Sequence, residues 1–165
     1  MSNCLIKQIA KKKKRSGFTL FELIIVIVII VIIATTGFTV SAGRIISNDL
    51  TTKVHEITYN LKLAQMRSIT RYKDDTWGLY FNAAGRTFTI YKGASYATRT
   101  TAHDLVLSIP TDLSFGAITL NGGGSEIVFD KLTGKTTKYG TIVITPSQGT
   151  ALTISVNALG VVDIN

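Results

Sequence analysis

His55 and Glu56 open the spacing H-E-x-x-H, in which two histidines one helical turn apart bind zinc and the glutamate acts as a base. The fifth position is Tyr59, so the second histidine ligand is missing. Only His103 and Cys4 remain as further histidine or cysteine ligands. Because a zinc site needs three or four protein ligands, we expect none, and we interpret His55 as a residue on the polar face of a helix.

Two further segments have residue types that bind ligands: Asp74-Asp75 and the run "NGGGSE" at Asn121–Glu126. Adjacent acids just after a helix are typical of a solvated turn. The glycine-rich run lacks the lysine and the serine or threonine of a phosphate-binding P-loop, and it therefore favours a mobile hairpin loop. Nothing marks a serine as a nucleophile. The sequence thus predicts no catalytic residue, no metal and no cofactor, and we infer that the protein is not an enzyme.

The formal net charge of +8 would suit a nucleic-acid-binding protein. Six of the positive residues lie within the first 17, however, and beyond them 12 Lys and Arg face 10 Asp and Glu. Nucleic-acid binding stays open as an alternative, because nine later cations could form a phosphate-binding patch if the fold brought them together. These are Arg67, Arg71, Lys73, Arg86, Lys92 and Arg99, followed by Lys131, Lys135 and Lys138.

The carboxylate of Glu22 stands at the start of an otherwise apolar run, Leu23 to Ala34. No formal charge follows before Arg44, and a helix over Leu23–Gly43 would cover the roughly 30 Å hydrocarbon core of a membrane. The basic run Lys11 to Arg15 precedes it, and basic residues mark the cytoplasmic side. The pattern predicts one membrane-spanning helix with its N-terminus in the cytoplasm and the remainder of the chain outside it.

Beyond Gly43, apolar residues recur at intervals of three and four, as on one face of a helix. They are Ile46, Leu50, Val54, Ile57, Leu61 and Ala64. Polar residues are expected on the other faces, among them Asn48, Lys53, Glu56, Asn60 and Lys62. Since no proline precedes Ile109, a single helix of about 50 residues, from near Phe18 to near Tyr72, is allowed, with bends at Gly37 and Gly43.

After Tyr72 the pattern is almost wholly that of strands. The runs "TWGLYFN" and "TFTIYKG" flank "AAGR" and predict a hairpin, in which Trp77, Tyr80, Phe88 and Tyr91 pack within the sheet rather than stack on a ligand. Further strands are expected at Leu105–Ile109, Leu113–Leu120, Ser125–Phe129, Thr141–Thr145, Ala151–Val156 and Val161–Ile164. We predict an α+β fold, in which a long N-terminal helix, membrane-spanning in its first half and amphipathic in its second half, packs on an antiparallel β-sheet domain.

The segment "KKKKRSGFTLFEL" closely resembles the class III signal of type IV pilins and type II secretion pseudopilins. A short basic leader ends at Gly17, Phe18 follows as the new N-terminus, and Glu22 is the fifth residue after the junction. The resemblance implies that a prepilin peptidase of the membrane cuts after Gly17 and methylates the new amine of Phe18. We therefore expect a leader peptide at 1–17, a transmembrane and assembly helix at 18–43, an amphipathic helix at 44–72 and a β-rich pilin-like domain at 73–165.

The remainder of the chain is similar to minor pilins of the GspH/FimT type. Their helix ends in "ARSEAI", which "AQMRSI" at Ala64–Ile69 resembles. Their β domain carries an element "g-x-i-x-F-d-x-x-G", similar to "GGSEIVFDKLTG" at Gly123–Gly134, and a late strand "i-x-G-x-v", similar to "VNALGVVDIN". Two positions depart from the pattern: Thr39 replaces a common helix proline, and Ile and Val replace the usual small residue or glycine midway through the apolar run.

Two interpretations of Glu22 follow. Its side chain could extend from the end of a membrane helix to the lipid headgroups, at a cost below the roughly 2.5 to 3.5 kcal/mol of a charge at the bilayer centre. Cleavage after Gly17, however, creates an amine at Phe18. In a filament of such helices, Glu22 of one subunit could pair with the Phe18 amine of a neighbour, and an unpaired carboxylate there would be strongly disfavoured. The resemblance to pilins favours this second role.

The sequence therefore favours a minor pilin or pseudopilin that enters the cytoplasmic membrane, is processed by prepilin peptidase, and assembles with other pilins or pseudopilins into a type II secretion pseudopilus or a type IV pilus. One alternative is a DNA-uptake minor pilin that binds DNA through its β domain. Another is a permanently membrane-anchored β-domain protein. Ordinary signal cleavage after the "VSA" sequence that ends at Ala42 is a further, simpler alternative.

Overall fold

A computed structural model describes residues 17–165 of the protein, and of residues 35–47 it describes the backbone only. The basic leader and Cys4 lie outside the described residues, and so do the side chains of Thr39, Ala42 and Ile46. The chain divides into two compact units, Met1–Thr39 and Val40–Asn165. The β-rich part of the sequence belongs wholly to the second unit.

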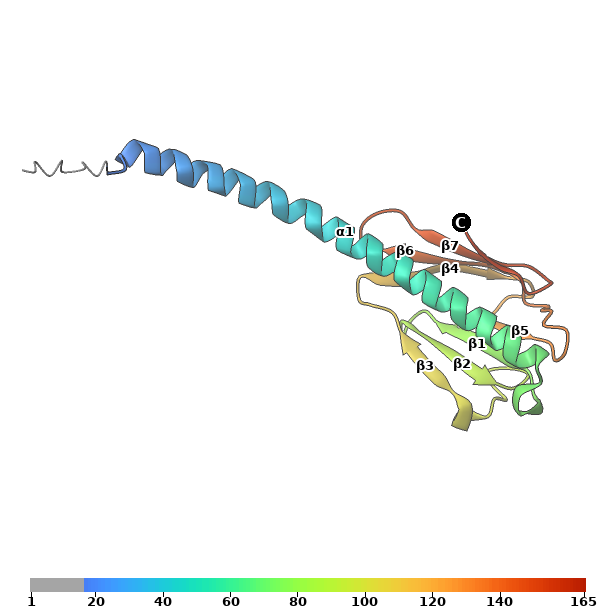
Figure 1. Ribbon diagram of the computed structural model, residues 1–165. Coiled ribbons are helices and arrows are strands. Elements are labelled where there is room, and N and C mark those ends of the chain that lie inside the picture. Colours follow the sequence, from blue (N-terminus) through green and yellow to red (C-terminus); the bar gives the residue numbers. More distant parts are fainter. Residues whose placement is uncertain (1–16) are drawn as a thin grey trace, which may run out of the picture. The chain divides into compact units, whose positions relative to one another are not determined.

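The predicted long helix is present as α1, Leu20–Ile69, which has 50 residues (Figure 1). Its bounds fall within three residues of those expected, so this prediction is confirmed. The first part of α1 exposes its large apolar side chains, from Leu20 to Ile33, in every direction around the helix. No helix in the described part of the chain has the combination of length and hydropathy that defines a candidate membrane span.

The second half of α1 buries the apolar face that the spacing predicted. Its buried members are Leu50, Val54, Ile57, Leu61 and Ala64. The expectation for Asn60 is wrong, because its side chain is only 5% exposed. Asn60 lies three residues after Ile57 and four before Ala64, which puts it on the buried face, and its amide donates to the carbonyl of Glu56 at 2.8 Å.

Eight strands follow, and each overlaps a strand predicted from the sequence. They form two four-stranded antiparallel sheets rather than one. The first sheet has the order β3-β2-β1-β5, with β1 at Trp77–Asn82, β2 at Thr87–Lys92, β3 at Leu105–Ser108 and β5 at Glu126–Phe129. The second has the order β4-β6-β7-β8, with β4 at Leu113–Leu120, β6 at Gly140–Pro146, β7 at Leu152–Val156 and β8 at Val162–Ile164. Two short 3-10 helices, η1 (Tyr72–Asp74) and η2 (Thr101–His103), lie between these elements.

Two glycine-containing segments, "AAGR" and "NGGG", were both predicted as hairpin loops, but only the first is one. The "AAGR" segment joins β1 to β2 as the expected hairpin, with Asn82 opposite Thr87. The "NGGG" segment is not a hairpin loop, because β4 pairs with β6 and β5 pairs with β1. It carries the chain from one sheet to the other, and its carbonyls at Gly122 and Gly123 accept hydrogen bonds from the Lys138 ammonium.

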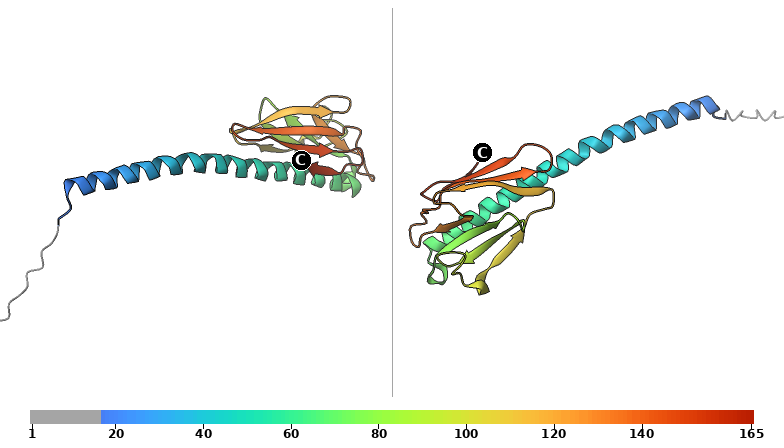
Figure 2. Two further views of the ribbon diagram at one scale, coloured as in Figure 1. Left: turned by 90° about the horizontal axis from the view of Figure 1, so that it is seen from above. Right: turned by 180° about the vertical axis from the view of Figure 1, so that it is seen from behind.

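The core lies between the second half of α1 and both sheets, which Figure 2 shows on one side of that part of the helix. Phe81 of β1 and Phe115 of β4 meet edge to face, with ring centroids 5.7 Å apart, and so join the two sheets. The prediction of packing roles is confirmed for Trp77, Phe88 and Tyr91, which are all buried. Half-buried Tyr80 stacks on the Tyr96 ring.

Two side chains near the end of α1 bind the loops of the β domain to the helix. The amide of Gln65 donates to the carbonyl of Gly134 at 3.0 Å and to that of Leu159 at 3.3 Å. The hydroxyl of Ser68 accepts the backbone N–H of Trp77 at 2.8 Å. We call Gln65 and Ser68 the helix clamp, since they hold three separate segments against one turn of helix.

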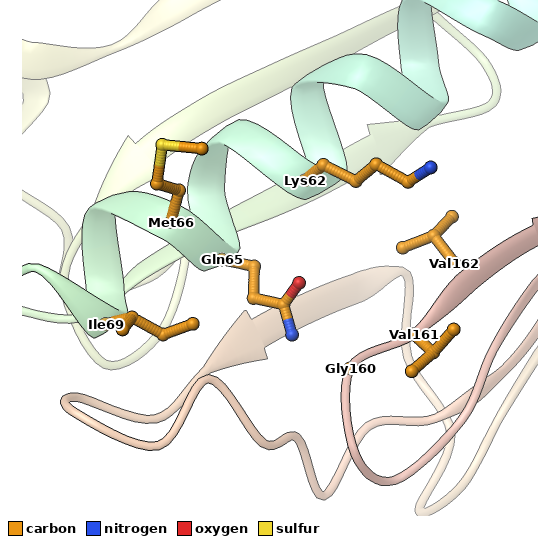
Figure 3. A pocket seen from close by; sticks show the side chains of 7 residues that line it. All are labelled: Lys62, Gln65, Met66, Ile69, Gly160, Val161 and Val162. Atoms are coloured by element: carbon orange, nitrogen blue, oxygen red, sulfur yellow. The ribbon is translucent and has the colours of Figure 1, made fainter.

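Beside the helix clamp is an open cavity of about 440 Å³ (Figure 3). Its lining residues come from α1, from the loop before β8 and from the start of β8: Lys62, Gln65, Met66, Ile69, Gly160, Val161 and Val162. Gly160 has φ +82°, and a Cβ there would overlap the Gln65 amide nitrogen and the Gly134 carbonyl oxygen. Gly134 has φ +64°, and its Cβ would lie 2.6 Å from Cδ1 of Ile69. Both glycines are therefore needed for close approach to the helix.

Replacing Gly160 by alanine should destabilise the protein far more than replacing Gly124. Both residues have positive φ, but a Cβ on Gly124 would meet nothing within 4 Å. We expect a loss of about 1 kcal/mol for Gly124→Ala and of about 3 kcal/mol for Gly160→Ala, because the latter also displaces the helix clamp. Urea unfolding of the full chain in non-ionic detergent, followed by the fluorescence of buried Trp77, measures both. Equal losses would mean that the clamp contact contributes nothing.

Candidate functional site

The junction predicted for processing lies just before α1. Gly17, Phe18 and Thr19 are outside the helix, and all three are exposed. The Phe18 side chain is 77% exposed, and a Cβ on Gly17 would have no neighbour within 4 Å. The peptide bond between Gly17 and Phe18 is therefore free of helical hydrogen bonds and open to an approaching enzyme.

Thr19, next to the predicted junction, is a helix-capping residue that the sequence reasoning missed. Its hydroxyl accepts the backbone N–H of Glu22 at 3.2 Å, and its carbonyl accepts the N–H of Leu23 at 3.2 Å. These are the contacts of a helix N-cap, and they fix the start of α1 at Leu20. The spacing T-x-x-E of a capping box, Thr19 to Glu22, was the signal that could have revealed it.

Glu22 lies in the first turn of α1 with an exposed side chain. Negative charge is favoured at this end of a helix, since the free N–H groups of the first turn carry partial positive charge. Among the described residues, no basic group pairs with the Glu22 carboxylate. Thr19 caps the backbone N–H of Glu22, and the carboxylate itself is exposed.

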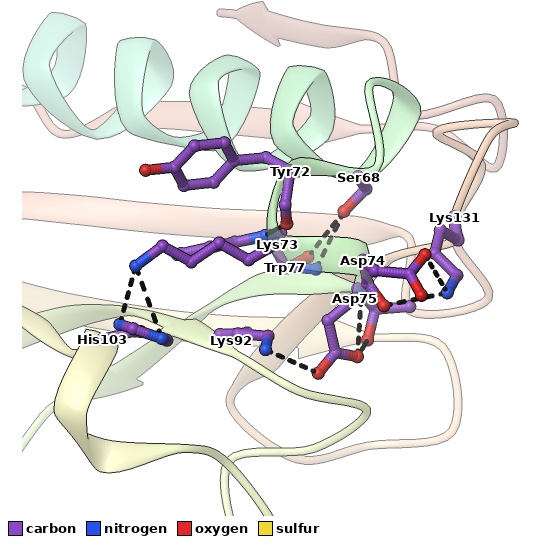
Figure 4. Close-up of polar contacts among 10 residues, drawn as sticks. Ser68, Tyr72, Lys73, Asp74, Asp75, Trp77, Lys92, His103 and Lys131 are labelled. Carbon is purple, nitrogen blue, oxygen red and sulfur yellow. Dashed lines mark hydrogen bonds and ion pairs between the residues drawn. The ribbon is translucent and has the colours of Figure 1, made fainter.

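Four of the six mid-chain cations come together around the end of α1, as Figure 4 shows in part. Two of them are neutralised within the chain: Arg71 lies 2.6 Å from a carboxylate oxygen of Asp74, and Lys92 lies 3.7 Å from one of Asp75. The two acids thus form the predicted turn, but an ion-paired one. The other two cations are Arg67 and Lys73, and no carboxylate of the described residues pairs with either.

Asp74 also accepts a hydrogen bond from Lys131, at 3.2 Å. The hydrogen bonds from Arg71 and Lys131 hold the pKa of Asp74 below its ordinary value. Asp74 therefore stays ionised until the pH falls below the usual range of a carboxylic acid, and the turn keeps its ion pairs at neutral pH. No group of three or more potential metal ligands occurs among the residues that the structure describes.

Of the two remaining candidates, Arg86 lies away from Lys92, whereas the residue after Arg99, Thr100, bonds to the carbonyl of Lys92. Arg86 precedes β2 and Lys92 ends it, so they lie at opposite ends of that strand, and Arg86 donates to the carbonyl of Thr111. Arg99 donates to Asp104 at 2.7 Å and stacks on Tyr96, with its guanidinium carbon 3.7 Å from the ring centroid. The hydrogen bond to Asp104 raises the pKa of Arg99. Arg86 is therefore missing from the cation patch considered from the sequence, and Asp104 neutralises Arg99.

The three loosely matched sequence elements meet at the helix clamp. Gln65 and Ser68 belong to "AQMRSI", and Gly134 ends the element "GGSEIVFDKLTG". Gly160 lies in the late strand element. Segments nearly 100 residues apart thus share one contact region, in which each glycine provides the space that the helix requires.

Comparisons with known proteins agree with these features. Residues 12–38 match the family model of the prokaryotic N-terminal methylation motif. A crystal structure of the minor pseudopilin EpsH from the type II secretion system of Vibrio cholerae is similar to this chain with a TM-score of 0.54 and 11% sequence identity, covering 71% of this chain and 93% of EpsH. A second EpsH structure, also from Vibrio cholerae, gives a TM-score of 0.52 and 11% sequence identity, and the match covers 71% of this chain and 96% of EpsH. No curated protein sequence matches the chain.

The methylation motif covers the junction at Gly17 and the acidic residue Glu22. The similarity to EpsH covers most of the chain and establishes that the two proteins share a helix-on-sheets fold. The chain thus carries a prokaryotic N-terminal methylation motif and shares the fold of a minor pseudopilin.

Proposed function

We propose that this chain is a minor pilin or pseudopilin, a structural subunit of a type II secretion pseudopilus or a type IV pilus. The observation that carries the proposal is the N-terminal methylation motif at 12–38, joined to a helix whose first part leaves its apolar side chains uncovered. A soluble monomer seldom exposes an apolar patch of this extent, so this surface needs lipid or other helices around it. The EpsH structures, which are of a minor pseudopilin, support the minor class.

Processing precedes assembly in this proposal. Prepilin peptidase cuts between Gly17 and Phe18, and the amine of Phe18 is then methylated. The exposed, non-helical conformation of Gly17 to Thr19 supports this step, because a peptidase needs the scissile bond outside a helix. Domain limits of 1–17, 18–43, 44–72 and 73–165 follow for leader, assembly helix, amphipathic helix and β domain.

Before assembly, the segment 18–43 holds the subunit in the cytoplasmic membrane as a single span. The basic leader keeps the N-terminus in the cytoplasm, and the β domain lies on the other side. The side chains from Leu20 to Ile33 would face lipid there, and the helices of neighbouring subunits once the chain is extracted into the filament.

Glu22 would then pair with the Phe18 amine of a neighbouring subunit. The Thr19 cap supports this role, since it satisfies the Glu22 backbone N–H and leaves the carboxylate free. Inside a bundle of apolar helices, a charge without its partner is penalised by several kcal/mol, so the pair fixes the axial offset between subunits.

Mass spectrometry of the mature protein tests the processing step. The expected N-terminus is Phe18 carrying one methyl group, and co-expression with an inactive prepilin peptidase should leave the leader attached. A Gly17→Val variant should remain uncut, because a β-branched side chain replaces the glycine at the scissile bond. A mature N-terminus at any other residue, Ala42 included, would overturn the proposal.

Glu22→Gln tests the assembly step. The variant should be cut and methylated normally but should enter the filament at least about tenfold less well, because the Phe18 amine of the neighbour loses its charged partner. The matched control is Asp49→Asn, which neutralises another exposed acid of the same helix. Quantitative immunoblotting of sheared filaments, normalised to the membrane fraction, gives the ratio. Normal incorporation of the Glu22 variant would exclude the charge pair.

A DNA-uptake role is the second candidate, favoured by Arg67 and Lys73, which no described carboxylate neutralises. Binding of duplex DNA by the processed subunit, weakening as salt rises, would support it. A permanently anchored protein without a filament role is the third candidate, and it would keep residues 1–17 in cells that contain active prepilin peptidase.

A further inference from the structure

β3 is an edge strand whose outer side is open. It pairs with β2, with Leu107 opposite Phe88 and Leu105 opposite Ile90. The bond from the Ile109 N–H to the Arg86 carbonyl fixes which positions face β2, because bonded pairs alternate along an antiparallel ladder. Residues 105, 107 and 109 bond inward, so the backbone groups of Val106 and Ser108 point outward, where no described segment bonds to them.

β3 also lacks the features that normally protect an edge strand. Its sequence "LVLS" contains no charge, proline or bulge. Leu105 is 47% exposed and Val106 is 59% exposed. The second sheet is protected at both edges: β4 has a register irregularity between Phe115 and Ile118, and β8 has three residues, one of them Asp163. A strand added to β3 would bury apolar surface and satisfy outward backbone groups together.

Lys73 and His103 lie at the end where β3 begins, and Arg67 lies over Trp77 of β1, which is two strands away from β3 in the sheet. Lys73 Nζ is 3.1 Å from Nδ1 of His103, which immediately precedes Asp104 and β3 (Figure 4). The Arg67 guanidinium lies over the Trp77 ring, 4.6 Å from its centroid, and both Arg67 and Lys73 are 5.6 Å from the centroid of Tyr72. No carboxylate among the described residues pairs with Arg67, Lys73 or His103.

Lys73 is held in this position by a strained turn. Arg71, Lys73 and Asp74 all have φ between 53° and 56°, a conformation that residues other than glycine seldom adopt. The ion pairs of Asp74 with Arg71 and Lys131 offset the strain. The turn therefore places Lys73 next to η2, where its ammonium contacts His103.

We propose that β3 binds an extended segment of another filament subunit as an additional antiparallel strand, apolar at alternate positions and carrying a carboxylate at its C-terminal end. An antiparallel strand brings its C-terminal end to the start of β3, where Arg67, Lys73 and His103 can receive the carboxylate. The outward groups of Val106 and Ser108 supply the backbone bonds. We call these five residues the β3 edge site. The choice of a filament subunit as partner rests on the proposed function. The chemistry of the bound segment rests instead on the open edge of β3 and the cations near its start.

Synthetic peptides test the proposal on the full chain in non-ionic detergent, with fluorescence anisotropy as the readout. The probe is dye-labelled TVTVTVDE with both ends blocked. One comparison peptide carries the two acids at its N-terminal end, and the other replaces them by Asn and Gln. The probe should bind at least about tenfold more tightly than either, as expected for one charge-assisted hydrogen bond. Equal binding of the three peptides would overturn the proposal.

Val106→Pro is the decisive variant, because proline removes an outward N–H and leaves the inward bonds of Leu105 and Leu107 in place. Peptide binding should be lost, whereas Val106→Thr should keep it. Unchanged Trp77 fluorescence and unchanged thermal unfolding show that both variants are folded. Arg67→Met with Lys73→Met should weaken the probe at least about tenfold and leave the Asn-Gln peptide unchanged. Probe binding that survives Val106→Pro in the folded protein would exclude strand addition.

Two other occupants would also overturn the proposal. Dimers that form in sedimentation and disappear with Val106→Pro would assign the edge to a second copy of the chain. Duplex DNA binding that is lost in the Arg67 and Lys73 variant, while the probe still binds, would assign the cations to nucleic acid. Failure of the proposed function is separate: a chain that binds the probe but never enters a filament keeps the β3 edge site and loses the filament role.

Discussion

One buried stripe of a single helix holds the β domain together. Leu50, Val54, Ile57, Leu61 and Ala64 are almost fully covered, and they form one core with buried residues of both sheets, among them Phe81 and Phe115. Burying such a stripe contributes on the order of 1.5 to 3 kcal/mol for each large side chain. The two sheets therefore depend on the helix as their common inner surface, which explains why the loops beneath its end are so tightly adapted to it.

The helix clamp extends this dependence into polar chemistry. Gln65 satisfies two loop carbonyls, and Ser68 satisfies the N–H of Trp77, so groups that the helix covers do not lose their hydrogen bonds. Close approach is possible only because Gly134 and Gly160 carry no Cβ. A rotation of the helix by a fraction of a turn would break all of these contacts at once. They therefore fix the position of the end of α1 relative to the loops of the β domain.

Most charged side chains near the end of α1 form ion pairs within the chain, whereas a few have no oppositely charged partner among the described residues. Around the end of the helix, the acids Asp74, Asp75 and Asp104 neutralise most nearby cations and hold turns in shape. Glu22 and the pair Arg67 and Lys73 are exceptions, since no oppositely charged group of the described residues pairs with them. In our proposals each of these charges has a partner in an assembly: Glu22 within the filament, and Arg67 and Lys73 at the β3 edge site.

The sequence by itself determined the local elements: the extent of α1, its apolar stripe and the approximate position of every strand, because each depends on spacing within a short segment. It also contained the signal for Thr19, in the T-x-x-E spacing. Only the tertiary structure decided which strands pair, and hence that "NGGG" joins two sheets, that Arg86 and Lys92 lie at opposite ends of β2, and that Asp104 neutralises Arg99. It alone revealed that Gln65 meets Gly134 and Gly160, and that β3 has an open edge. These facts depend on partners far away in the chain, which local periodicity does not specify.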